Sequence, residues 1–141
     1  FISFLPLSSI VFHFTSSAAP GTDLLTSVSL YGPNGNVVAG PVEAAAEAGT
    51  NQKVTFTDTV TYPVGKGVYT LKGKVDSDIA NAVTIQASTT PSTDWTTITG
   101  QTTGNTISLS TLSTAVAMNT MTVKAAALAF TVSPTPSTPT P

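Results

Sequence analysis

The stretch KVTFTDTVTY, residues 53–62, decides the fold class, because apolar and polar side chains alternate along it. Val54, Phe56 and Val60 share one parity, and threonines occupy the other. A period of two is typical of a β-strand with one buried face. Asp58 interrupts the apolar parity, so we expect this residue near a sheet edge.

Similar segments lie on both sides of this stretch. Residues 27–31 alternate and lead into GPNGN (32–36), where Asn34-Gly35 favours a type I′ hairpin turn, since both residues tolerate positive φ. The other segments that predict strands are VYTLKGKV (68–75), AVTIQAS (82–88), TDWTTIT (93–99), NTISLS (105–110) and MTVKAAALAFTV (121–132). VEAAAEAG (42–49) is the one stretch with helical propensity, and we expect a single helical turn or a loop there, because eight residues form a marginal helix.

Roughly nine or ten short strands separated by turn signals predict an all-β sandwich with Greek-key connections. A small closed barrel gives the same local pattern and stays an alternative. We divide the chain into an apolar N-terminal strand at residues 1–8, a sandwich domain at 9–132 and a Pro/Thr-rich spacer at 133–141.

The composition points away from several classes of function. Charged residues make up 9% of the 141 residues, against about 25% in an average globular domain. The net charge is −2 and there is no arginine, so a nucleic-acid partner is not expected. Cysteine is absent, which excludes disulfides and thiolate metal sites. The 27 threonines and 15 serines suit an extracellular or cell-surface protein.

The sequence offers no catalytic constellation, and we expect a protein that is not an enzyme and has no cofactor. His13 is the single histidine and lies between two phenylalanines, so alternation predicts a surface histidine rather than a metal ligand or a general base. The pair Glu43 and Glu47 is expected to solubilise a connector, and Asp76-Ser77-Asp78 to form a solvated turn without the glycine and distal glutamate of a calcium loop.

The C-terminal stretch SPTPSTPTP (133–141) contains four prolines, which forbid a β-ladder and favour an extended polyproline II spacer. Such Pro/Thr segments are typical of O-glycosylated stalks. The residues that we expect to carry sugar are Thr135, Ser137, Thr138 and Thr140.

Three segments resemble the repeated immunoglobulin-like domains of large prokaryotic surface proteins: DLLTSVSLYGPNGNVVAGPV (23–42), KVTFTDTVTYPVGKGVYTLKGKVDSD (53–78) and GNTISLS (104–110). The first block matches in Asp23, Leu24, Leu30 and Tyr31 among others, and the second approximates the family in Phe56 and further residues. The resemblance spans roughly residues 9 to 109. It implies an extracellular β-sandwich, and its motifs recur across many functions.

The N-terminal stretch FISFLPLSSIVFHF (1–14) is apolar enough to suggest a signal peptide or a pilin-type helix. It lacks a basic start, and Leu5 stands where type IV pilins carry an acidic residue. Ile2 and Phe4 alternate before Pro6, and Ile10, Phe12 and Phe14 alternate after it. Two strands therefore explain the stretch better, the first of which could complete a sheet of another subunit.

These observations predict a structural subunit of an extracellular, pilus-like filament or surface layer that binds copies of itself by β-strand complementation. The donor strand is expected at Phe1–Leu5 or at Ala125–Val132. The interface residues that we predict are Phe1, Ile2, Phe4, Leu5, Leu128, Phe130 and Val132. The competing hypothesis is a carbohydrate-binding or adhesin module on a stalk, in which Trp95 and the tyrosines contact glycans. No membrane span is expected.

Overall fold

The computed structural model of the chain describes residues 4–17, 25–63, 65–77, 79–96, 98–100 and 102–124. This part of the chain is all-β, with one short helix. The first nine strands are β1 (Phe4–Leu7), β2 (Ile10–Ser16), β3 (Leu25–Tyr31), β4 (Val37–Val42), β5 (Ala45–Ala46), β6 (Asn51–Phe56), β7 (Val60–Pro63), β8 (Thr70–Val75) and β9 (Thr84–Thr89). Then follow α1 (Pro91–Asp94), β10 (Ile98–Thr99), β11 (Thr106–Ile107), β12 (Val116–Ala117) and β13 (Met121–Thr122).

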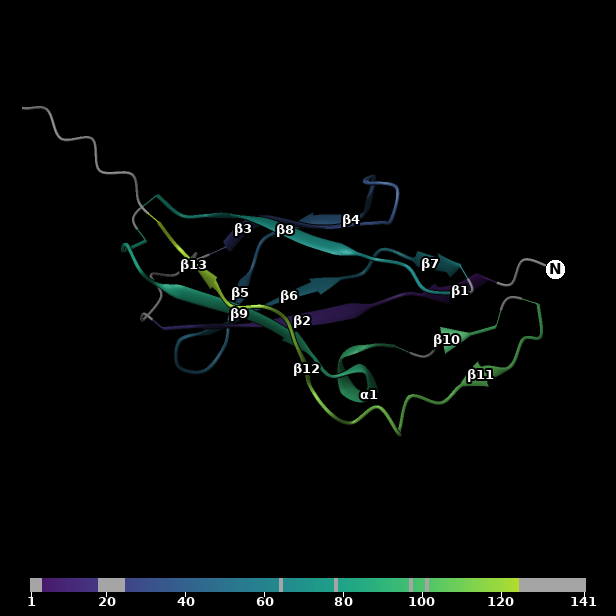
Figure 1. Cartoon of the computed structure of the whole chain (residues 1–141). Coiled ribbons are helices and arrows are strands. Elements are labelled where there is room, and N and C mark those ends of the chain that lie inside the picture. The colour runs from purple at the N-terminus through teal and green to yellow at the C-terminus, as the bar shows by residue number, and fades with distance from the viewer. Residues whose placement is uncertain are drawn as a thin grey trace, which may run out of the picture.

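Two antiparallel sheets pack face to face (Figure 1). The larger sheet has the order β12-β9-β2-β6-β5, and β13 also pairs with β9. The smaller sheet has the order β4-β3-β8. Two further two-stranded antiparallel sheets, β1-β7 and β10-β11, lie at one end of the molecule (Figure 1). Strand β2 lies between β6 and β9, which are both distant from it in sequence, whereas β3 pairs with β4 in a hairpin and with the distant strand β8.

The core lies between the two sheets and follows the predicted alternation. In β6, Val54 and Phe56 are fully buried, and Val60 of β7 is almost so. Phe12 of β2 meets Phe56 edge-on, with ring centroids 6.1 Å apart. In β9, the predicted inward residues Val83, Ile85 and Ala87 are also buried, although Val83 lies just before the strand. The period of two therefore identified the inner face of the larger sheet correctly.

Two local predictions between residues 32 and 49 were wrong in whole or in part. The helical turn considered for residues 42–49 does not form; the segment is mostly irregular, as the loop alternative expected, and it contains the two-residue strand β5, because the pairing of Ala45 and Ala46 with β6 outweighs the helical propensity of alanine. The hairpin after β3 is not type I′, since positive φ occurs at Gly35 and not at Asn34. Pro33 instead favours a three-residue loop, in which Gly35 N–H donates to Gly32 O at 2.9 Å.

Helix α1 occupies the start of the segment 93–99 that alternation had predicted as one strand. Pro91 sits at the first helical position, where its missing N–H and fixed φ favour helix initiation. Trp95 follows the helix and forms an isolated bridge with Ile10. The strand that we expected is thereby reduced to β10.

Pro6 does not end the first strand. It pairs with Thr61 inside β1, which is possible because β1 has β7 as its single partner among the described residues, and proline is tolerated on an edge strand. The break falls at Ser8 and Ser9 instead. Asp58 lies in the interruption between β6 and β7, where its Oδ2 accepts a hydrogen bond from Gly40 N–H at 2.9 Å.

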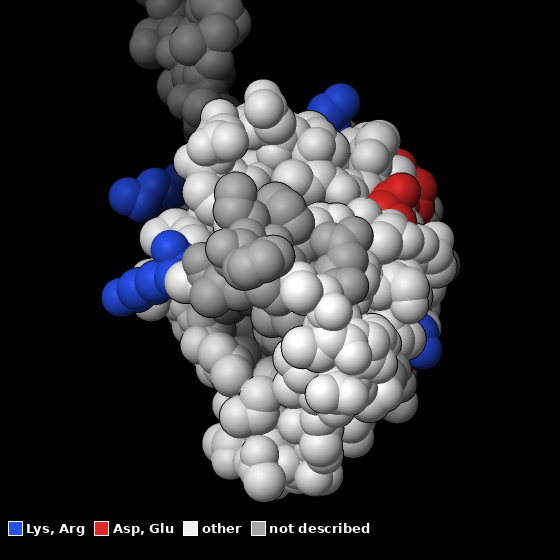
Figure 2. Space-filling model, turned by 90° about the vertical axis from the view of Figure 1, so that its right-hand side faces the viewer, with Lys and Arg blue, Asp and Glu red and all other residues white. Residues whose placement is uncertain are grey.

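The described part of the chain contains no helix of the length and apolarity required to cross a bilayer. The surface at the β1-β7 end is largely uncharged, with lysines near its outline (Figure 2). This agrees with the low charged fraction of the sequence.

Candidate functional site

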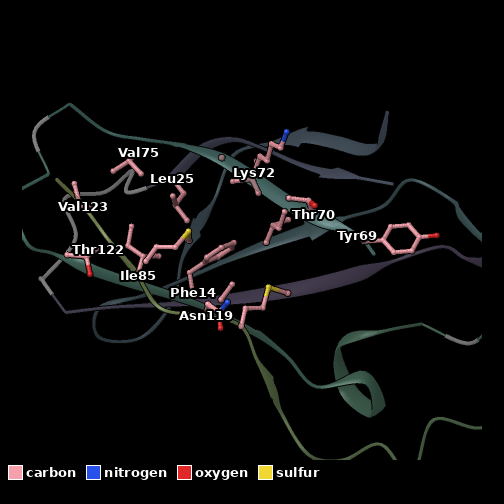
Figure 3. A pocket seen from close by; sticks show the side chains of 16 residues that line it. Phe14, Leu25, Tyr69, Thr70, Lys72, Val75, Ile85, Asn119, Thr122 and Val123 are labelled. Atoms are coloured by element: carbon pink, nitrogen blue, oxygen red, sulfur yellow. The ribbon is translucent and has the colours of Figure 1, made fainter. Parts of the chain in front are cut away.

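An apolar groove of about 750 Å³ opens between the two sheets, on the side where β8 faces β9 and β13 (Figure 3). The smaller sheet supplies one wall from β3 and β8, and the larger sheet supplies the other from β2, β9 and the segment 118–123. The lining residues are Phe14, Leu25, Val28, Tyr69, Thr70, Leu71, Lys72, Gly73, Val75, Ile85, Ala87, Met118, Asn119, Met121, Thr122 and Val123.

The floor of the groove is continuous with the core, whereas its rim is exposed. Val28 and Ile85 are each only 1% exposed. At the rim, Val75 is 41% exposed, Met118 37% and Met121 54%. Large apolar side chains are gathered on this open rim. Covering them with another apolar segment would remove apolar surface from water and lower the free energy of the system.

The groove exists because the smaller sheet ends at β8. Among the described residues, β8 pairs with β3 alone, through registers such as Leu25↔Val75 and Tyr31↔Thr70. Its outer edge therefore presents backbone N–H and C=O groups without a strand partner in this part of the chain. The opposite wall ends in β12 and β13, which are two residues long each. They pair with the two ends of β9 and not with its middle.

Side chains of β8 keep the groove apolar. Leu71 and Val75 contribute to its lining, and Gly73 adds no side chain that would narrow it. A Cβ at Gly73 would already lie 3.0 Å from Val28 Cγ2. Lys72 points away from the groove (Figure 3), and its ammonium lies 4.3 Å from the centre of the Tyr31 ring in a cation–π contact.

A second, polar cluster surrounds His13. Its Nδ1 lies 2.8 Å from Glu47 Oε2, and its Nε2 lies 3.3 Å from Asp94 Oδ1. Lys53 Nζ lies 3.7 Å from Glu47 Oε1. Asp94 Oδ2 also accepts a hydrogen bond from the backbone N–H of Thr90, immediately before α1, and so ties the helix to β2.

These contacts shift two pKa values in the His13 cluster. The hydrogen bond to Glu47 raises the pKa of His13 above its ordinary value of 6.5, against the opposing effect of burial, and Asp94 raises it further. Burial raises the pKa of Asp94, but the hydrogen bonds from Thr90, Thr93 and His13 outweigh it and leave this pKa below 3.8. The cluster therefore favours a protonated histidine between two carboxylates.

The cluster has the geometry of a structural ion pair. No hydroxyl nucleophile contacts His13 in the bonds found within the described residues, and no group of three His, Asp or Glu there is arranged to hold a metal ion. The prediction of a surface histidine is correct as far as exposure goes, but sequence reasoning missed both carboxylate partners. They lie 34 and 81 positions further along the chain, so only the strand pairing brings them together.

The aromatic residues considered for glycan stacking make different contacts: Tyr62 and Tyr69 contact each other, whereas Trp95 bonds to Thr89. The Tyr62 and Tyr69 rings contact each other at 4.8 Å between centroids, and burial raises the pKa of both phenols. The Trp95 indole donates to Thr89 Oγ1 at 2.9 Å, which in turn donates to Val11 O at 2.8 Å. Trp95 thus helps to attach α1 to β2 and β9.

Most of the predicted interface residues fall outside the described part of the chain. These are Phe1, Ile2, Leu128, Phe130 and Val132, and the predicted glycosylation residues Thr135, Ser137, Thr138 and Thr140 fall outside it as well. Phe4 and Leu5 are in β1, where their backbones pair with Pro63 and Tyr62 of the same chain. Sequence reasoning missed the groove. The signal that could have indicated it was the spacing of the apolar residues Met118, Met121 and Val123.

The chain matches no known protein family, no curated protein and no solved structure. The class that its fold and site define is therefore a two-sheet, all-β protein with an open apolar groove.

Proposed function

We propose that the protein is a structural subunit of an extracellular, pilus-like filament or surface layer, and that its subunits join by β-strand complementation. The observation that carries this proposal is the apolar groove beside the outer edge of β8, which has no strand partner among the described residues. A strand laid there would pair its backbone with β8 and place alternate side chains between the two sheets. The same strand would cover Val75, Met118 and Met121.

Strand addition fits this groove better than a small ligand does. The polar groups of a ligand need convergent partners in a pocket, and the lining here is dominated by aliphatic side chains and methionines. A β-strand instead satisfies its own polar backbone against the edge of β8, and it needs only apolar contacts from the groove.

The fold proposal that accompanies this function is an immunoglobulin-like sandwich with Greek-key connections, whose smaller sheet has three strands in the described part of the chain. The strand order supports it, since β2 pairs with the distant strands β6 and β9, and β3 pairs with the distant strand β8 as well as with its neighbour β4. The hydroxyl-rich composition and the Pro/Thr segment 133–141 support a cell-surface location with sugar on Thr135, Ser137, Thr138 and Thr140.

The test compares two substitutions that introduce the same charge. Leu71→Asp places a carboxylate in the groove wall, whereas Val68→Asp places it at a residue that is 71% exposed and does not line the groove. We expect filaments or large sheets of the wild type and of Val68→Asp under negative-stain microscopy, and dispersed monomers of Leu71→Asp. Wild-type protein that sediments as a monomer at every concentration and salt condition would overturn the proposal. Glycan binding by such a monomer, lost on Trp95→Ala, would favour the adhesin hypothesis.

A further inference from the structure

Resting on the proposed function, we infer that the groove binds residues Ala125–Val132 of a neighbouring copy, with Leu128, Phe130 and Val132 facing the core, and that the N-terminal strand is not the donor. The sequence alone left both termini open. The pairing of β1 with β7 argues against the N-terminal strand as the donor, and the position of Val123 favours the C-terminal segment.

The N-terminal strand is already used within its own subunit. All four residues of β1, from Phe4 to Leu7, pair with β7, and Leu7 is fully buried. Donation of this strand to a neighbour would break that pairing and expose Leu7. The subunit would lose an internal contact for each external contact that it gained.

The segment 125–132 has the length and pattern that the groove requires. The six residues of β8 span about 20 Å in an extended strand, and eight residues span about 26 Å. Within the segment, Leu128, Phe130 and Val132 share one parity, while Ala129 and Thr131 share the other. The ladder must stop soon after Val132, because Pro134 has no N–H to donate.

The position of Val123 indicates that the segment enters a neighbour's groove. Val123 lies at the end of the groove near Leu25 and Val75 (Figure 3), and its N–H donates to Val83 O at 2.8 Å. Strand β13 runs toward this end, because Met121 pairs with Ile85 and Thr122 with Thr84 at the start of β9.

To fill its own groove, the chain would have to reverse immediately after Val123. The residues available for that turn are Lys124, Ala125 and Ala126, and none is a glycine, proline, asparagine, aspartate or serine. Because no residue here favours a turn, we infer that the segment leaves the end of the groove rather than folding back into it. A copy stacked at that end can receive it. This contact is heterologous and repeats head to tail, and it generates a fibre when the rotation between copies does not close a ring.

The first experiment substitutes adjacent residues of opposite parity in the full chain. Phe130→Asp puts a charge on the face that enters the groove, and Thr131→Asp puts it on the other face. We expect Phe130→Asp to abolish filaments and Thr131→Asp to retain them. Equal loss with both variants, or with neither, would contradict the assigned parity.

The second experiment tests whether the segment of one copy occupies the groove of another. The Phe130→Asp variant keeps an intact groove, and the Leu71→Asp variant keeps an intact segment 125–132. In an equimolar mixture the segment of Leu71→Asp can therefore bind the groove of Phe130→Asp, and no further copy can be added. We expect light scattering after size exclusion to show a 1:1 dimer in the mixture and monomers in each variant alone. Val75→Asp, at a rim position, replaces Leu71→Asp if circular dichroism shows that the latter is unfolded.

The outcomes separate this inference from the function on which it rests. If wild type forms filaments and the mixture stays monomeric, the inference fails, while the proposed structural function stands with another donor. If wild type forms no assembly, the proposed function fails, and the donor assignment fails with it. Filaments that persist after deletion of residues 125–141 would also reject this segment as the donor.

Discussion

The two sides of the core differ although they are built from the same kinds of residue. Between β2, β6 and β4 the core is closed, and Val54 and Phe56 are fully buried. Between β8 and β13 it is open, and Val75 and Met121 are 41% and 54% exposed. Both strands β4 and β8 are outer strands of the smaller sheet among the described residues. On the closed side β4 approaches β6, so that a Cβ at Gly40 would lie 2.9 Å from Phe56 Cε1, whereas on the open side the groove separates β8 from β13. Burial of an apolar residue here depends on its strand neighbours more than on its type.

The largest expected effect lies in the closed side. Phe56→Ala removes a fully buried ring that packs edge-on against Phe12, so both the apolar transfer free energy and a cavity contribute. We expect the free energy of unfolding to fall by about 3–5 kcal/mol, measured by urea denaturation of dissociated subunits. Thr55→Ala, on the exposed face of the same strand, should change it by less than about 0.5 kcal/mol. Equal losses would mean that β6 has no buried face.

The next effect tests how closely the sheets approach at Gly40. Its φ is +89°, and a Cβ there would lie 2.6 Å from Val28 O and 2.9 Å from Phe56 Cε1. Gly40→Ala should cost roughly 2–3 kcal/mol in the same urea assay, from the left-handed conformation and the displaced backbone. Gly35→Ala is the matched control, because φ is +76° but the Cβ meets open space. We expect it to cost about 1 kcal/mol.

A stabilising change is expected at Gln52. Its side chain is fully buried, and neither its Oε1 nor its Nε2 has a hydrogen-bond partner among the described residues. Gln52→Met keeps the shape and removes the desolvated amide, so the free energy of unfolding should rise by about 1 kcal/mol. Gln86→Met should instead lower it, because Gln86 Nε2 donates to Met118 O at 3.0 Å. A fall with Gln52→Met would mean that the amide is bonded.

The His13 cluster predicts a pH dependence on the closed side. Because the folded pKa of His13 is raised, its stabilisation is complete below pH 6.5 and is lost as the pH rises through that raised pKa. Because the folded pKa of Asp94 is lowered, its stabilisation is present above pH 3.8 and is lost as the pH falls through that lowered pKa. The stability difference between wild type and His13→Gln should therefore peak between these pH values, at under about 1 kcal/mol. A difference that grows above pH 8 would contradict the assignment.

The smallest effect on the subunit is expected at the open rim. Val75→Thr should change the unfolding free energy by less than about 0.5 kcal/mol when measured in the monomeric Leu71→Asp background, since Val75 is already 41% exposed. Val54→Thr, the same change at a fully buried position, should cost roughly 1–3 kcal/mol. In the wild-type background Val75→Thr should weaken assembly. Equal costs at the two positions would mean that the rim is buried in the monomer.

Strand β6 and the hairpin after β3 show which parts of the fold could be predicted from the sequence and which could not. In β6 a strict period of two is a local signal, and it predicted the buried face correctly. At Gly35 a turn was predicted correctly, but its type was not, because Pro33 and Asn34 are compatible with several turn types. The turn type also depends on the register shifts between β3 and β4, which are a property of the strand pairing. The groove could not be predicted, because it results from where the smaller sheet ends.

The sequence by itself determined the all-β class, the residues that face inward in β6 and β9, and the scarcity of charge. These properties follow from side-chain chemistry and from a period of two, both of which are local. Only the tertiary structure decided that β1 pairs within its own chain, that His13 contacts Glu47 and Asp94, and that the outer edge of β8 has no strand partner among the described residues. Those features depend on which strands become neighbours, and strand pairing is set by the burial of the whole core rather than by any one segment.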